Sequence, residues 1–230
     1  MTGTKTEEKK LIATVLSAAL QLWLRSQVEG VESLKIHVGG GNRSLLRGSI
    51  PTVSVSAKAV IYQGLHLSQV ALSSSGIRIN LRQVLQGKPL QLLEAIPVDC
   101  DLQILASDLN ASVSSPLLAN AITQLLQSHL PLTEGTLEHL QLRLNSDRLT
   151  LNADLITDSH GAIALSLDSQ LQRISSTQLL LHQPYIKADP LISATVLESI
   201  PIELGTDVDI EDLSISEEQL TLRGKIWVNP

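Results

Sequence analysis

The chain has 230 residues, enough for one large domain or two small ones with a sizeable core. Its formal net charge of −6 argues against a nucleic-acid partner and against strong electrostatic capture by anionic membranes. The single cysteine, Cys100, excludes an intramolecular disulfide, and the sequence predicts no cofactor.

Aliphatic side chains dominate this sequence. It is 43% hydrophobic and 17% charged, with 44 leucines, no phenylalanine and only four aromatic residues. Because aromatic rings normally provide much of the area and rigidity of a core, a leucine-rich interior suits a flexible apolar ligand. The alternative is that leucine simply fills the core in place of phenylalanine.

The N-terminal segment predicts a helix over residues 7–29. Its charge-free run, Leu11–Leu24, has 14 residues and is too short to span a bilayer, which takes about 20. Glu7 and Glu8 and the lack of a small-residue cleavage site argue against a signal peptide. Polar residues recur on one narrow stripe, so protein or lipid must surround the rest of the helix. We expect a protein that is cytoplasmic or peripheral to a membrane.

Alternating strands are predicted over residues 34–105. In β-strands successive side chains face opposite sides, and the apolar residues between Val53 and Ile61 fall on every second position. Gly39–Gly41 predicts a hairpin turn, because a strand-like segment follows instead of the helix that a phosphate-binding glycine loop requires.

A second amphipathic helix is predicted over residues 108–130. Ser115 is a good N-cap, Pro116 suits the first helical position, and an apolar stripe follows. Residues 136–228 then form a second strand set, with a short helix expected within residues 189–201.

Catalytic and metal-binding patterns are weak. Asp158, Ser159 and His160 are neighbours on one turn, whereas a catalytic triad needs residues that converge from different elements. The acidic run from Asp207 to Glu218 lacks the glycine that a calcium loop needs at its sixth position. The sequence therefore predicts no enzyme and no metal site.

Several motifs occur in an order that resembles one bacterial family. They are "LWLRSQVEGVESLKI", "NRSLLRGSIPTVSVSAKAVIYQGLHLSQVALSSSGIRIN", "VLQGKPLQLL" and "ASDLNASVSSPLLANAI". Their order resembles the LmeA-like phospholipid-binding family, over residues 11–126 by motif and beyond by strand pattern. The resemblance implies a fold similar to the tubular lipid-binding superfamily, phospholipid binding and no enzymatic activity. Family members outside the cytoplasm carry a signal or anchor, and this sequence predicts neither. The resemblance therefore does not imply a compartment.

We therefore expect one α+β domain over residues 1–230, with a strongly curved antiparallel β-sheet wrapping a long N-terminal helix. The expected ligand is phospholipid or another long-chain lipid, held in an aliphatic groove at a membrane surface; whether there is a protein partner is unknown from the sequence. The residues expected to line the groove are Leu16, Leu20, Trp23, Val53, Val55, Ile61, Leu65 and Leu67. The alternative is a protein-interaction or scaffold module with a fully packed core, in which Pro116–Leu130 docks a partner.

Overall fold

A computed structural model describes residues 3–40, 42–45, 47–129 and 135–230, with side chains described from Thr14 onward except at residues 42 and 43. The elements in chain order are α1 (Gly3–Ser26), β1 (Gly30–Gly39), α2 (Asn42–Leu45), β2 (Ser49–Tyr62), β3 (Leu65–Arg78), α3 (Leu81–Val84), β4 (Ile96–Leu105), α4 (Ala106–Ser112), α5 (Pro116–His129), β5 (Thr136–Asn145), β6 (Arg148–Thr157), β7 (Gly161–Arg173), β8 (Gln178–Ala188), β9 (Ile192–Val196), β10 (Ile200–Glu203), β11 (Val208–Ile215) and β12 (Gln219–Val228). The fold is mostly β with a few helices, as the alternating pattern predicts.

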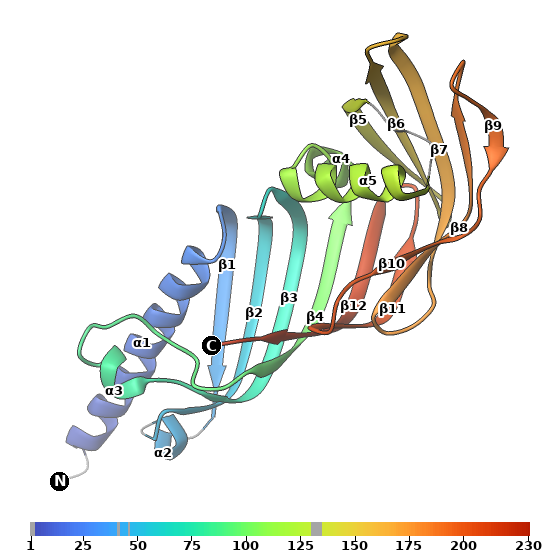
Figure 1. The fold of residues 1–230 in the computed structure, drawn as a ribbon. Coiled ribbons are helices and arrows are strands. Elements are labelled where there is room, and N and C mark those ends of the chain that lie inside the picture. Colours follow the sequence, from blue (N-terminus) through green and yellow to red (C-terminus); the bar gives the residue numbers. More distant parts are fainter. Residues whose placement is uncertain (1–2, 41, 46, 130–134) are drawn as a thin grey trace.

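The strands form two antiparallel sheets, neither of them closed (Figure 1). The first has the order β1-β2-β3-β4-β12-β11, so the last two strands of the chain complete a sheet begun by the first four. The second has the order β10-β8-β7-β6-β5, with β9 paired to β8. The expected second strand set is therefore divided between the two sheets.

The first sheet has one apolar and one polar face, and α1 lies on the apolar face. Leu16 and Leu20 of α1 belong to one buried cluster with Val53 and Val55 of β2. The segment from Ile79 to Leu92, which includes α3, contributes to the same cluster and lies beside α1 (Figure 1). Burial of this apolar area, at roughly 25 cal/mol per Å², holds the helix on the sheet.

The second sheet is covered by α5, whose Ile122, Leu125 and Leu126 pack into a second buried cluster with β6, β7 and β8. α4 joins the two sheets, since it contacts β3 and β4 of the first and β5 of the second. Ser112 of α4 accepts a hydrogen bond from the backbone N–H of His66 at 2.7 Å, and Asn110 accepts one from that of Leu142 at 2.9 Å.

Several expectations need correction. A sheet wrapped around the N-terminal helix is not shown, because α1 contacts chiefly β1, at one edge of the first sheet, and α2. The second helix is two helices, α4 and α5, separated at Val113–Ser115. Residues 192–196 form β9 where a helix was expected.

The start of α5 agrees with the sequence. Pro116 is its first residue, and the Ser115 Oγ accepts a hydrogen bond from the backbone N–H of Leu118 at 3.3 Å. This contact caps an N–H group that has no partner within the helix.

Candidate functional site

Five of the eight expected lipid-binding residues lie together. Leu16, Leu20, Val53 and Val55 are 1–8% exposed in the first buried cluster, and Trp23 packs against it, partly buried. These side chains contact one another as an ordinary core does, with α1 and β2 as the two sides.

The other three expected residues, Ile61, Leu65 and Leu67, are separated from that cluster by a change of facing in β2. Ala59 adopts a left-handed φ of 48° and is exposed, and Val60, the next residue, is 6% exposed. Ile61 therefore lies on the opposite side of the strand from Val60 and stands opposite Gly30 of β1. The interpretation of one continuous apolar face from Val53 to Ile61 was wrong beyond Ala57.

Leu67 stands opposite Val60 and packs in a small cluster with Ala57, Val60 and Val70, whereas Leu65 is half-buried opposite Tyr62 at the end of the hairpin. The structure thus does not bring all eight expected residues to one site.

A second group of apolar side chains lies on the α1 side of β4, β12 and β11. Its members are aliphatic and half-exposed, and they stand opposite one another in two rows across the three strands. They are Leu102, Leu222 and Leu213 in one row and Ile104, Leu220 and Ile215 in the next. We call these six residues the apolar platform. None of them belongs to a buried cluster, although Leu102 packs against one.

Sequence reasoning missed the platform because β4 and β12 are far apart in the chain. Each strand alternates by itself, as "LTLRGKI" does, but only the pairing of Leu102 with Leu222 shows that their faces combine.

Cys100 precedes Leu102 on the same face of β4. Its side chain is 8% exposed, and burial, followed by the nearby Asp101 carboxylate, raises the pKa of the thiol from 9.0 to about 11. At neutral pH the thiol is therefore protonated, and it behaves as a small apolar side chain.

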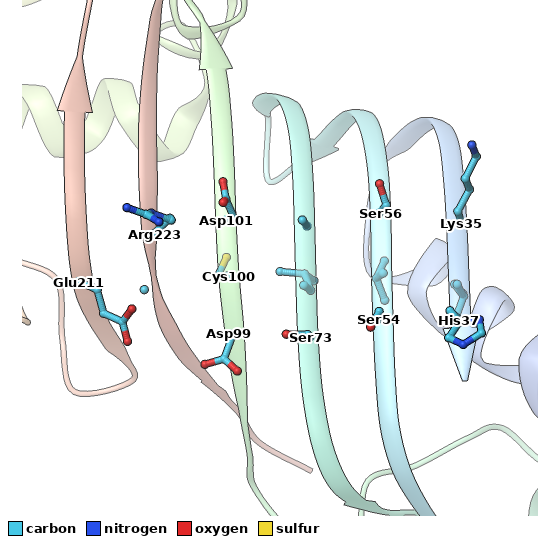
Figure 2. Close-up of a pocket in the computed structure, with 15 residues that line it drawn as sticks. Lys35, His37, Ser54, Ser56, Ser73, Asp99, Cys100, Asp101, Glu211 and Arg223 are labelled. Carbon is cyan, nitrogen blue, oxygen red and sulfur yellow. The ribbon is translucent and has the colours of Figure 1, made fainter. Parts of the chain in front are cut away.

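The polar face of the first sheet carries a hollow of about 570 Å³. Its exposed lining residues alternate with buried or half-buried ones along β1, β2, β3, β4 and β12, so the hollow lies on the face opposite α1. Small residues, Ser54, Ser56 and Ser73, form its centre, while Lys35 and His37 stand on one flank and acidic residues and Arg223 on the other (Figure 2).

Two of the charged residues that line this hollow, Asp99 and Arg223, form ion pairs. Arg223 lies 3.1 Å from the Asp212 carboxylate, and Lys225 lies 3.4 Å from that of Asp99. Exposed pairs of this kind contribute little to stability.

A second hollow, of about 680 Å³, lies between the β2–β3 turn and the start of α5. Leu117 and Asn120 of α5 line one side, and Gln63 and Gly64 the other. Glu29 closes the site by accepting a hydrogen bond from the Gly64 N–H at 3.2 Å. None of the described side chains of α1, from Thr14 onward, lines either hollow, so neither is the expected groove beside that helix.

The weak catalytic and metal patterns fall on exposed turns and strands. Ser159 Oγ lies 2.7 Å from His160 Nδ1, but the structure records no hydrogen bond between Asp158 and His160, and all three residues are exposed. Within the described ranges, no three His, Cys, Asp or Glu side chains converge as metal ligands would. Nor does any described helix have the length and hydropathy needed to cross a bilayer.

Comparison with known proteins gives one match. A family model described as LmeA-like phospholipid-binding matches residues 8–225, nearly the whole chain. No curated protein and no solved structure matches it.

Proposed function

The chain belongs to the LmeA-like phospholipid-binding family, and from that premise we propose that it binds phospholipid, or another long-chain lipid, at a membrane surface without catalysing a reaction. The proposal places the acyl chains on the apolar platform. The observation that carries it is the half-exposure of six aliphatic side chains on the face that α1 covers elsewhere.

The platform matches the chemistry of an acyl chain. Its six side chains are branched and aliphatic, with no charged residue among them, and Cys100 continues the same face as a protonated thiol. An acyl chain gains about 0.8 kcal/mol for each CH₂ that it buries, so binding needs no polar contact along the chain. If this surface stayed exposed to water, it would forgo the roughly 25 cal/mol per Å² that burial of apolar area contributes.

The competing function is a protein-interaction module that uses α5 to dock a partner. Its apolar stripe does not favour that function, because Ile122, Leu125 and Leu126 already pack against the second sheet. Leu117, which is 45% exposed, is the main apolar side chain that α5 leaves in solvent.

Lipid extraction tests the proposal directly. Purified protein is extracted with organic solvent and analysed by mass spectrometry, and native mass spectrometry of the intact protein measures how much lipid each chain carries. We expect phospholipid in stoichiometric amount. Protein that carries no lipid, and that after delipidation takes up none from vesicles, would contradict the proposal.

A further inference from the structure

Charge is distributed very unevenly along this chain. Residues 35–98 contain seven Lys or Arg and one acidic residue, Glu94, whereas residues 189–218 contain nine acidic residues and no Lys or Arg. The net charge of −6 is therefore a sum over a chain that contains both a strongly basic region and a strongly acidic one. The acidic segment forms β9, β10 and β11, away from α2 and α3 (Figure 1).

The basic region meets exposed leucines at one end of the molecule. Leu85 and Leu93, on the segment that includes α3, are 51% and 55% exposed. Arg82 and Lys88 lie on the same segment and are exposed, as is Arg47 just after α2. We call these five residues the basic tip.

Backbone contacts hold the parts of the basic tip together. The Ile79 N–H donates to the Gly48 carbonyl at 3.0 Å, and a Cβ at Gly48 would lie 3.5 Å from the Leu81 Cβ. Arg47 and Arg82 are each one residue from this contact. The Lys88 N–H in turn donates to the Gln83 carbonyl at 2.9 Å.

The segment is anchored from beneath, so its exposed leucines do not result from loose packing. Leu81, Val84, Leu90 and Leu92 are buried in the same cluster as Leu16 of α1. The Asn80 side chain also accepts a hydrogen bond from the Gln91 N–H at 2.8 Å. Some side chains of this segment therefore face the core, while others face the solvent.

The cations of the basic tip are available to a ligand. Glu94 lies 3.5 Å from Arg78, and none of the salt bridges between described residues includes Arg47, Arg82 or Lys88. Exposed cations on the same segment as exposed leucines are typical of a surface that inserts apolar side chains between lipid headgroups and binds anionic lipids around them.

We propose that the basic tip docks the protein on an anionic membrane surface. This docking places the part of the first sheet formed by β1, β2 and β3 nearest the bilayer. This inference rests on the proposed lipid-binding function and adds to it the charge of the membrane and the end of the molecule that contacts it. The acidic strands β9–β11 favour the same orientation, because an anionic surface repels them.

Vesicle co-sedimentation of the full chain tests the docking. The membranes are vesicles of phosphatidylcholine alone and of phosphatidylcholine with phosphatidylglycerol in equal parts. We expect binding to the anionic vesicles only, with loss of binding at high salt. The variant Arg82→Gln/Lys88→Gln should bind them about 25-fold more weakly, at about five-fold for each cation lost.

Matched controls separate docking at the tip from diffuse charge effects. Lys58→Gln/Arg143→Gln removes two exposed cations elsewhere and should bind the anionic vesicles like the wild type. Leu85→Ser/Leu93→Ser should weaken binding, whereas Leu117→Ser/Leu191→Ser, at two exposed leucines outside the tip, should not. Thermal unfolding of each variant shows whether the fold is kept.

Equal binding to both vesicle types, wild-type binding by both tip variants, or equal losses in the controls would each overturn the inference. The proposed lipid binding is measured separately, by extraction of lipid from the same proteins, and tip variants should retain their lipid. A protein that docks through the tip but carries no lipid would contradict the proposed function and not this inference.

Discussion

Leu102 on β4 stands directly opposite Leu222 on β12, and both face the side of the first sheet that carries α1. Leu222→Gln should therefore weaken phospholipid binding. Loss of contact with about two CH₂ groups costs about 1.6 kcal/mol, or about 15-fold in affinity. Titration of delipidated protein with a phospholipid that carries a fluorescent acyl chain measures the change.

The control for this variant is Thr221→Gln, because Thr221 precedes Leu222 on β12 and faces the other side of the sheet. It should bind lipid like the wild type. Leu222 and Thr221 are both half-exposed, so replacing either one opens no cavity in the core, and stability should change little. Equal affinity of both variants would show that acyl chains do not lie on the apolar platform.

The sequence predicts only in part which side chains of β2 face the core. Alternation predicts correctly that Val53, Val55 and Ala57 share a buried face. The reversal after Ala57 has no local signal, because alanine rarely adopts a positive φ and nothing in "AKAVIY" marks one. The reversal places Val60 in the cluster of Ala57 and Val70, a tertiary contact that no local pattern encodes.

The sequence predicts individual helices and strands, but it does not predict which strands pair with one another. Strand periodicity and the Ser115–Pro116 start of α5 are local properties, and both are present in the structure. The return of β12 to pair with β4 joins segments more than 100 residues apart, which periodicity does not determine. The candidate site depends on that pairing, so its residues could not be chosen from the sequence.

Gly64 provides a test of how the β2–β3 turn packs on α5. Its φ is +74°, and an added Cβ would lie 2.7 Å from the Ser115 Cβ. Gly64→Ala should therefore combine backbone strain with a steric clash and destabilise the protein by about 2–4 kcal/mol. Urea unfolding of the variant measures the loss.

Gly161→Ala is the matched control, since Gly161 has a similar φ of +70° but no atom within 4 Å of the added Cβ. It should retain the strain alone, about 1 kcal/mol. Equal losses at the two positions would mean that the turn and Ser115 are not in close contact.

Ser115→Ala should destabilise the protein by about 1 kcal/mol, because it removes the acceptor of the Leu118 N–H at the start of α5. Ser115 is 7% exposed, so water replaces the lost contact poorly. Ser114→Ala, at the exposed neighbouring position, is the control and should have little effect on the midpoint of chemical unfolding. A loss no larger at Ser115 than at Ser114 would show that the cap contributes nothing.

Cys100 gives a chemical measure of packing on the first sheet. Since burial and Asp101 raise its pKa from 9.0 to about 11, the thiolate fraction at pH 8 falls about 100-fold. Reaction with a disulfide reagent should be at least that much slower in folded protein than in urea, and should accelerate as the pH approaches 11. Similar rates in folded and unfolded protein would contradict the burial.

The same thiol makes stability depend on pH with a definite sign. Its folded-state pKa lies above the unfolded value, so between pH 9 and 11 the unfolded chain binds fewer protons than the folded one. Its contribution to stability is therefore complete below about pH 9 and is lost as the pH rises toward 11. Cys100→Ser should lack this part of the alkaline decline in urea unfolding.

Because Cys100 shares a face with Leu102, bound phospholipid should also slow the reaction of the wild-type thiol with the disulfide reagent. An unchanged rate would argue against lipid on that face.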